Sequence, residues 1–506
     1  MAVPIRSDGV DDPFSPAAEA ALAEARGLGV FLIARFEHLR ERTVIASAGE
    51  RRQITSSRRS GVGMHVVRGD GRIGFASTDD LSPSSVAALV GEAVAIAAVV
   101  PAPGRSEPFM GVGADYGAPC EVREGLAARE RFDAVDLDAE SAQVERANVE
   151  CWQRRADTAV RTTYACVDDS WRIVRSDGVD VSFSLPRAYV RHQLSVRTAG
   201  ESATGSAYVS GLDERVLFTE ETRERLGKSA AIVERRIRET AGAGSVPHGP
   251  ARLVMDFALA KGFAHEAIGH AAEADLVRAS YLGRAGRFRL GERVGATGVR
   301  VEDGPIAGDY AEQRVGAYGG SRPTITIIDD GVLVGGLGDP FFSPALGLPH
   351  ADCARAASYR DRPLPRMSNI RLLHTRASRY IGDPDRMDTD DVLATLRAGG
   401  VPTTDRPTYL LVGYRGGQAD PHQGTFLFTA AFAYDLTDGG SPKRGVTLAG
   451  SSEAALRCIS AAFGGPRFDA MGSCTKDGST VPSSGGSHRL LVIEPTGEVA
   501  VGGSGR

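Results

Sequence analysis

Two histidines five residues apart place a strict condition on the local fold of this chain. They are His265 and His270, in the stretch KGFAHEAIGHAAEADL (261–276), and Glu266 directly follows the first of them. In the common zinc-peptidase motif HExxH, the histidines are four residues apart and share one helix face. Because each residue of a regular α-helix turns about 100°, side chains five residues apart diverge by about 140°. On such a helix, the two histidines cannot bind the same metal ion.

Two local structures would bring the His265 and His270 side chains together. A π-helical turn nearly aligns residues five apart, and such turns are frequent at functional sites. Alternatively, the helix breaks between the histidines, and Gly269, directly before His270, would permit that break. If both histidines bind one metal ion, the spacing therefore predicts a distorted helix. An alanine-rich surface helix that exposes polar side chains explains the same sequence. The spacing alone does not decide between a metal site and such a surface helix.

Glu266 would lie beside such a metal ion without binding it. A carboxylate in that position can take a proton from an attacking water molecule and return it to a leaving amine. Glu273 and Asp275, about one turn further along, could orient a histidine ligand by hydrogen bonding. We therefore predict that Glu266 is the catalytic residue of a hydrolytic reaction, provided that the metal site exists.

A catalytic zinc ion needs three protein ligands and one open position, so two histidines are not enough. The candidates for the third ligand are Glu273, His350, His374, His422, Cys353, Cys458 and Cys474. Cys474 differs from the others because it lies in the Gly- and Ser-rich segment DAMGSCTKDGSTVPSSGG, which has no helical or strand pattern and carries Lys476. A nearby cation and small neighbours suit a reactive or metal-bound thiolate. An exposed, unpaired cysteine is the alternative.

The clearest linker in the chain is AGAGSVPHGP (241–250). Before it, alternating runs interrupted by Gly and Asp predict a meander of strands. Helical patterns accompany these strands at 15–27, 81–99, 128–157 and 214–240. After the linker, the patterns are mostly those of strands. We therefore expect an α+β protein, with an N-terminal α/β domain over 1–240 and a β-rich domain with a metal-binding helix over 241–506.

Composition excludes several classes of function. The net charge of −5 and the isoelectric point near 6.1 give no indication of a nucleic-acid-binding surface. The most apolar run, VAALVGEAVAIAAVV (86–100), is too short to span a bilayer and contains Glu92. The acidic, polar start MAVPIRSDGVDDPF is unlike a secretory signal, and the six cysteines form no CxxC pair. We expect a soluble, cytoplasmic protein with reduced thiols.

Several ordered motifs resemble the TldD/PmbA family of metallopeptidases, first named as modulators of DNA gyrase. The segments HEAIGHAAEAD, GGQADPHQGTFLFTAAFAYDL and MGSCTKDGSTVP carry the resemblance in the C-terminal half. GVGMHVVRGDGRIGFASTDDLSPSSV and RPLPRMSNI resemble further family segments, so most of the chain is covered. The family implies an α/β domain followed by a β-rich metal domain, assembled as dimers. TldD-like chains carry HExxxH and the late cysteine, whereas TldE-like partners lack both, and this chain is similar to the TldD-like kind.

The resemblance implies a role for each candidate residue. His265, His270 and Cys474 match the family's metal ligands, and Glu266 matches its catalytic glutamate. Two imidazoles and one thiolate suit zinc and leave one position open. The implied activity is hydrolysis of peptide bonds in unfolded or extended peptides, by a homodimer or by a heterodimer with a TldE-like chain. An amidase that removes an aminoacyl group from a small natural-product precursor and a non-catalytic, gyrase-modulator-type interaction protein are the alternatives.

Three segments bear on the substrate. Gly416 and Gly417, in GYRGGQADPHQGTFLF, would let an extended peptide approach and add as a strand, or they form a bulge or turn. The sequence also departs from the family pattern twice. GGSRP, within 316–347, stands where TldD-like chains have DDEG, and VPSSGGSH (481–488) lacks the usual PVGxGxP. These departures leave the substrate and the partner open.

Overall fold

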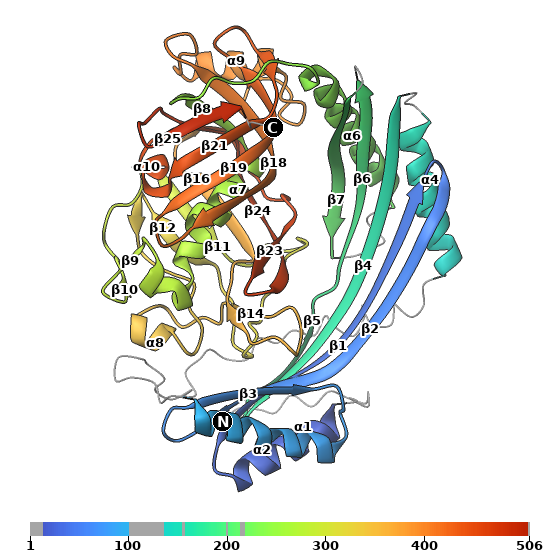
Figure 1. Cartoon of the computed structure of the whole chain (residues 1–506), viewed down its shortest axis with the longest axis vertical. Helices are drawn as coiled ribbons and strands as arrows, with labels where there is room; N and C mark the ends of the chain where they lie inside the picture. Colours follow the sequence, from blue (N-terminus) through green and yellow to red (C-terminus); the bar gives the residue numbers. More distant parts are fainter. Residues whose placement is uncertain (1–13, 101–135, 154–156, 199–200, 213–217, 504–506) are drawn as a thin grey trace.

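The computed structural model describes residues 14–100, 136–153, 157–198, 201–212 and 218–503. These residues form two main sheets, one of seven strands from the N-terminal part and one of fourteen strands from the C-terminal part. Figure 1 shows the long N-terminal strands arching beside the C-terminal sheet. The predicted α+β class is confirmed. The predicted domain boundary at 240/241 stays a prediction.

The N-terminal sheet has the strand order β3-β2-β1-β4-β6-β7, with β5 beside β4. Its strands are β1 (Phe31–Ser47), β2 (Glu50–Val67), β3 (Ile73–Thr78), β4 (Thr158–Arg175), β5 (Asp180–Ser184), β6 (Arg187–Thr198) and β7 (Glu201–Gly211). All its neighbouring strands are antiparallel. Ala48 and Gly49, both with positive φ, close the β1–β2 hairpin in a two-residue turn, the geometry that fits the twist of paired strands.

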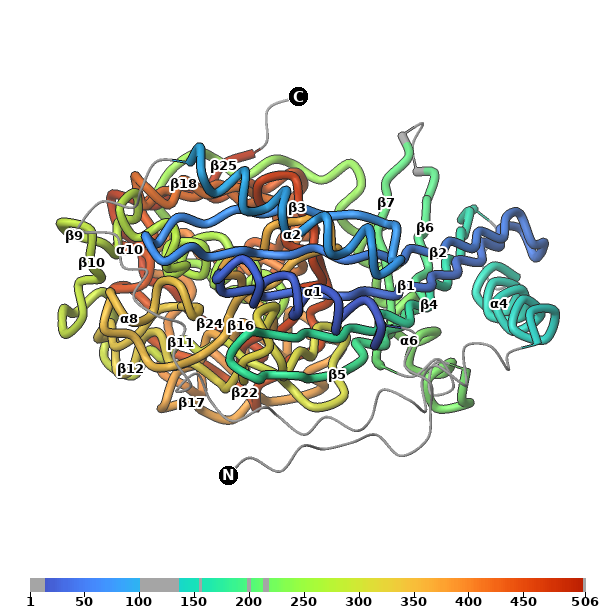
Figure 2. The backbone as a smooth tube through the Cα atoms, turned by 90° about the horizontal axis from the view of Figure 1, so that it is seen from below, coloured from blue at the N-terminus to red at the C-terminus, as the bar shows by residue number. Residues whose placement is uncertain are grey.

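Among the described residues, four helices accompany this sheet: α1 (Ser15–Gly27), α2 (Pro83–Val99), α4 (Leu137–Trp152) and α6 (Glu220–Thr240). Figure 2 shows α1 and α2 side by side across the end of the sheet that carries β3. The helix α4 packs against β1 and β4, and α6 packs against β6 and β7 and reaches the C-terminal sheet. These helices confirm the helical pattern at 15–27, and they confirm the patterns at 81–99, 128–157 and 214–240 over Pro83–Val99, Leu137–Trp152 and Glu220–Thr240. The stretches 128–135, 154–156 and 214–217 of these patterns, and the predicted loop at 101–127, lie outside the described residues.

The main path of the C-terminal sheet is β13-β12-β11-β16-β24-β8-β18-β19-β21-β25. In chain order these strands are β8 (Arg252–Asp256), β11 (Val299–Asp303), β12 (Ile325–Asp329), β13 (Val332–Leu333), β16 (Asn369–His374), β18 (Thr408–Asp420), β19 (Thr425–Asp435), β21 (Val446–Ser451), β24 (Ser479–Ile493) and β25 (Val499–Gly503). Further strands at its margins are β17 (Ala377–Ser378), β20 (Ser441–Lys443), β22 (Ile459–Arg467) and β23 (Gly472–Lys476). Two small hairpins, β9 (Gly283–Arg284) with β10 (Arg287–Phe288) and β14 (Ala354–Arg355) with β15 (Leu364–Pro365), lie outside it.

Four α-helices belong to this part of the chain: α7 (Phe257–Phe263), α8 (Ser343–Leu346), α9 (Thr389–Ala398) and α10 (Ser452–Arg457). The strand β8 is buried along its whole length between β24 and β18, and it leads directly into α7. The Asp256 carboxylate caps α7 by accepting a hydrogen bond from the Leu259 amide (2.8 Å). The helix with the candidate histidines therefore begins at the centre of the sheet. No helix among the described residues is long and apolar enough to cross a bilayer.

The two sheets share buried side chains, and the GGSRP segment lies at their junction. Ile33, Trp171 and Phe183 from the N-terminal sheet form one apolar cluster with Tyr318 and Tyr359. Gly319 has a positive φ (82°) and faces valine and isoleucine side chains of β4 and of the segment leading into β5. Arg322 is fully buried and donates a 2.6 Å hydrogen bond to Asp303. The departure at this segment therefore forms part of the packing between the sheets.

Candidate metal centre

The helix changes its geometry at the histidines. Regular α-helix ends at Phe263, Ala264–Gly269 forms a π-helical turn, and His270–Ala272 continues as a 3-10 turn. The His270 amide donates to the His265 carbonyl, which is the i→i+5 hydrogen bond of a π-helix. The predicted distortion is confirmed in its π-helical form.

Gly269 has a role other than the predicted one. Its backbone stays helical (φ −60°, ψ −50°), so the helix does not break there. A Cβ at this position would lie 1.8 Å from the Met367 sulfur, so no larger residue fits. Gly269 therefore allows close packing of the π-helical turn against the PRMSN segment.

The turn brings together the three residues predicted as ligands. One ligand atom each from His265, His270 and Cys474 lies within 4.8 Å of the other two. The His270 Nε2 atom is 3.6 Å from the Cys474 sulfur. The Nε2 atom of His265 is buried and has no hydrogen-bond partner among the described residues. A buried imidazole nitrogen without a partner, next to a second imidazole and a thiol, fits a tetrahedral N/S-ligated ion such as zinc.

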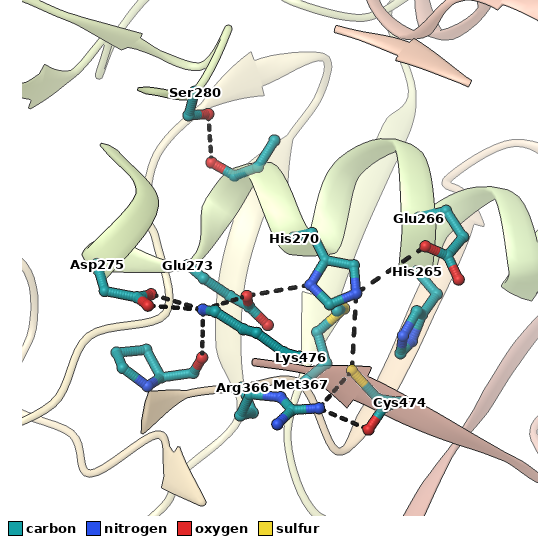
Figure 3. Close-up of polar contacts among 12 residues, drawn as sticks. His265, Glu266, His270, Glu273, Asp275, Ser280, Arg366, Met367, Cys474 and Lys476 are labelled. Carbon is teal, nitrogen blue, oxygen red and sulfur yellow. Dashed lines mark hydrogen bonds and ion pairs between the residues drawn. The ribbon is translucent and has the colours of Figure 1, made fainter. Parts of the chain in front are cut away.

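The other nitrogen of each imidazole is held by a protein group, as Figure 3 shows for His270. His270 Nδ1 lies 3.1 Å from Glu273, and His265 Nδ1 lies 3.1 Å from the Ser483 hydroxyl. Such contacts fix the ring orientation of metal-bound histidines. Glu273 therefore orients His270. Asp275 does so only indirectly: it accepts a 2.8 Å hydrogen bond from Lys476, which also donates a 2.8 Å hydrogen bond to Glu273.

Cys474 differs in two ways from its sequence-based description. It is 1% exposed and lies in the β23–β24 hairpin, so the alternative of an exposed cysteine and the interpretation of its segment as lacking strand pattern were both wrong. The Asp477-Gly478 pair forms the two-residue turn, a recognised hairpin signal. The cation at the thiol is Arg366, whose Nη2 lies 3.0 Å from the sulfur, and not Lys476. Burial alone would raise the pKa of Cys474, but His270 and Arg366 together lower it below its ordinary value.

Glu266 lies beside the three ligand atoms. Its Oε2 is 3.9 Å from His270 Nε2, and its Oε1 accepts a hydrogen bond from the Tyr414 hydroxyl at 3.3 Å. Burial raises the pKa of Glu266 above its ordinary value, although the charges of His270 and Lys261 oppose that shift. A carboxylate with a raised pKa, next to a metal site, suits proton transfer near neutral pH.

The remaining candidate ligands do not belong to this group. In the part of the chain that the structure describes, His265, His270 and Cys474 form the one triad with metal-binding geometry. Burial raises the pKa of Cys353 to about 12, which makes it an inert core thiol. His422 lies in a turn whose amides bind Asp420, and His374 accepts from the Arg376 amide. Cys458 is half-buried, and its pKa is raised by burial.

Four contributors to the site were missed in the sequence: Lys261, Arg366, Tyr414 and Ser483. Arg366 and Ser483 lie in segments quoted for other reasons, and their contacts span 108 and 218 residues. Tyr414 reaches Glu266 across 148 residues, from a bulge in β18 between Tyr414 and Gly416. The bulge interpretation of the glycines was therefore correct. The pairing of β18 with β8 ends at Leu411. Beyond that residue, the edge of β18 on the β8 side has no strand partner among the described residues.

Comparisons with known proteins agree with the geometry. A family model of the PmbA/TldA metallopeptidase C-terminal domain matches residues 248–485, and a model of domain 1 of the same family matches 34–97. A metalloprotease of Methanothermobacter thermautotrophicus is 27% identical over 459 residues, which cover 89% of this chain and 91% of that protein. A TldD homologue of Haemophilus influenzae, named as a metalloprotease, is 26% identical over 88% of this chain and 87% of its own length. A zinc metalloprotease TldD homologue of Saccharolobus solfataricus is 29% identical over 45% of this chain and 46% of its own length.

Two solved structures share the fold. A Thermotoga maritima chain described as a modulator of a DNA gyrase superimposes with a TM-score of 0.70 at 17% identity, covering 96% of this chain and 100% of that one. TldE of Thermococcus kodakarensis superimposes with a TM-score of 0.67 at 14% identity, covering 96% of this chain and 99% of that one.

Proposed function

Because the chain belongs to the PmbA/TldA metallopeptidase family, we propose that it is a zinc-dependent peptidase with His265, His270 and Cys474 as metal ligands and Glu266 as the proton-transferring residue. The observation that carries this proposal is the convergence of the three ligand atoms within 4.8 Å, with Glu266 beside them. The neighbouring groups support it, because Ser483 and Glu273 hold the two Nδ1 atoms and leave both Nε2 atoms for the ion.

A zinc ion bound there would supply a polarising charge for the scissile carbonyl and lower the pKa of a water molecule. Glu266 would accept a proton from that water as its oxygen attacks the carbonyl carbon. The same carboxyl group would then return the proton to the nitrogen as the C–N bond breaks, which gives a free amine and a carboxylic acid. The raised pKa of Glu266 favours both transfers near neutral pH.

The cation Arg366 has a supporting part in this scheme. A thiolate ligand donates negative charge and so makes a bound water less acidic than three neutral histidines would. The guanidinium of Arg366, 3.0 Å from the sulfur, offsets part of that charge. The arginine also donates to the Cys474 carbonyl at 2.6 Å, which fixes the ligand in the hairpin.

We propose that the substrate is an extended peptide, or an aminoacylated small molecule, held along β18. The edge of β18 after Leu411 has no strand partner on the β8 side among the described residues, and its bulge lies at Tyr414, the residue that touches Glu266. A peptide paired with that edge would be recognised mainly through its backbone. We propose that the chain acts as a homodimer or with a TldE-like partner, because TldE of Thermococcus kodakarensis shares its fold.

Removal of the metal tests the proposed centre. We expect a chelator to abolish hydrolysis of an unstructured peptide and to lower the thermal unfolding midpoint by several degrees, and we expect zinc to restore both. The physical reason is that an ion present at about 1,000 times its Kd stabilises the folded state by about 4 kcal/mol. Magnesium serves as the control, since it prefers oxygen ligands and should restore neither property. Full activity in metal-free protein would contradict the proposal, whereas zinc binding without activity would call for an assay with a TldE-like partner.

The substitution Tyr414→Phe tests the position of Glu266. We expect the variant to keep its zinc and to lose about 10- to 100-fold in kcat with little change in KM, because the hydroxyl is a preorganised donor next to the reacting atoms. The Tyr414 hydrogen bond lowers the pKa of Glu266, so its loss should move the acidic limb of the kcat/KM profile to higher pH. Tyr409→Phe, on the same strand, is the matched control. An unchanged pH profile would show that the Tyr414 contact has no part in proton transfer.

A further inference from the structure

Lys261 carries a buried charge without a carboxylate partner. The chain has four lysines, and three of them form ion pairs: Lys228 with Glu224, Lys443 with Asp435, and Lys476 with Glu273. Lys261 is 7% exposed, and in the described part of the chain no carboxylate lies within ion-pair distance of it. A buried and unpaired ammonium is costly, so its presence beside the ligands calls for a functional explanation.

The lysine is connected to a metal ligand through one hydroxyl group. Lys261 stands four residues before His265, on the same side of the helix. Its Nζ lies 3.1 Å from Ser483 Oγ, and the same oxygen lies 3.1 Å from His265 Nδ1. All three side chains are buried. Ser483 comes from the VPSSGGSH segment, one of the two places where this chain departs from the family pattern.

The number of protons in this row of atoms determines which nitrogen of His265 is available. To bind a metal through Nε2, the imidazole must carry its proton on Nδ1 and donate it to Ser483 Oγ. The Ser483 proton then needs an acceptor, and a neutral Lys261 amine is one. An ammonium is not an acceptor, and it leaves the Ser483 proton free to bind Nδ1, which places the imidazole proton on Nε2 and blocks that nitrogen.

The groups around Lys261 allow it to lose its proton near neutral pH. Burial lowers the pKa of Lys261 to about 8. This shift is opposed by the negative charges of four residues: Cys474 on β23, Glu266 on the π-helical turn, Asp303 and Asp309. Those two aspartates are already engaged. Asp303 binds Arg322 and Ser368, and Asp309 binds Asn369 and Ser484. Arg355 and Arg366 add positive charge near His265.

We propose that Lys261 is a positioning residue of the metal centre, whose neutral amine accepts the Ser483 proton and so holds His265 with its Nε2 lone pair toward the ion. Metal binding is then coupled to the release of one proton from Lys261. This inference rests on the proposed metal centre, and it assigns Lys261 and Ser483 a joint role in metal affinity.

A double-mutant cycle tests the joint role. Zinc affinity is measured by competition with a chelator at pH 8.5 for wild type, Lys261→Met, Ser483→Ala and the double variant, with Lys228→Met as a matched surface control. We expect each single variant to bind about tenfold more weakly, the usual effect of losing an outer contact to a ligand. The double variant should be no weaker than either single variant, because both changes break the same connection. Additive losses, about a hundredfold in the double variant, would overturn the proposal.

The pH dependence of the same affinities tests the proton release. Between pH 8 and 6.5, the ratio of wild-type affinity to Lys261→Met affinity should fall about 15-fold, because only the wild type must release the lysine proton. Protons lost by the ligands themselves are common to both proteins and cancel. A ratio independent of pH would overturn the proposal but leave the metal centre intact, whereas a wild type that binds no zinc at any pH would overturn the centre itself.

A second substitution covers the case in which Lys261→Met does not fold. The amide oxygen of Lys261→Gln can accept the Ser483 proton at every pH. We expect its zinc affinity to match that of wild type at pH 8.5 and to exceed it at pH 6.5. Equal or weaker binding than wild type at pH 6.5 would count against the proposal.

Discussion

Glu266→Gln should retain its zinc and lose peptide hydrolysis by about 1,000-fold or more. Glutamine has nearly the same shape and can still accept the Tyr414 hydrogen bond, but it cannot take up a proton from water. General acid–base catalysis by a positioned group contributes about 10²- to 10⁴-fold, and here one carboxylate would serve both proton transfers. Because Glu266 is not one of the three converging ligands, metal content should not change.

The measurement combines metal content, the unfolding midpoint and kcat on an unstructured peptide. The matched control is Glu19→Gln, an exposed position on α1 at the other end of the molecule, which should behave as wild type. Near-normal kcat in Glu266→Gln would remove Glu266 from the mechanism. Loss of zinc would instead mean that Glu266 is itself a ligand.

Cys474→Ala should lose its zinc. If about 12 kcal/mol of binding energy is shared among the three ligands, removal of one costs about 4 kcal/mol, or on the order of a thousandfold in Kd. The substitution also leaves the buried guanidinium of Arg366 with the Cys474 carbonyl but without the sulfur. The variant should therefore be inactive at zinc concentrations that saturate the wild type, and its unfolding midpoint should no longer respond to zinc.

Cys458→Ala is the control for the loss of a thiol, since Cys458 is half-buried outside the triad and should leave metal content unchanged. Chelator competition gives the affinities, and circular dichroism checks the fold of both variants. Full zinc occupancy in Cys474→Ala would show that another group supplies the third ligand.

Local features of the centre could be predicted from the sequence because they follow from helix geometry. The five-residue spacing of His265 and His270 required a distorted turn, and the π-helical turn at Ala264–Gly269 has that form. The helices α1 and α2 follow from periodicity together with the proline at the start of each. The role of Gly269 was not predictable, because the Met367 side chain that excludes a Cβ lies about a hundred residues further along the chain.

The surroundings of the ligands depend on contacts that no spacing rule describes. Cys474 seemed exposed because small residues and a lysine flank it, yet strand pairing with β24 buries it against Arg366. The Asp477-Gly478 turn was a usable signal for that hairpin, and it was overlooked. Lys476 is close to Cys474 in the sequence, but its ammonium group binds Glu273 and Asp275.

The position of the Cys474 hairpin also has a consequence for protein synthesis. Cys474 is 204 residues from His270, and its partner strand β24 lies in the middle of the C-terminal sheet, between β16 and β8. A nascent chain that has left the ribosome only as far as β22 therefore contains both histidines and Glu266, but it lacks the third ligand and a central strand. The proposed centre can form only after β23 and β24 have been synthesised, so a shorter nascent chain would lack the proposed peptidase activity.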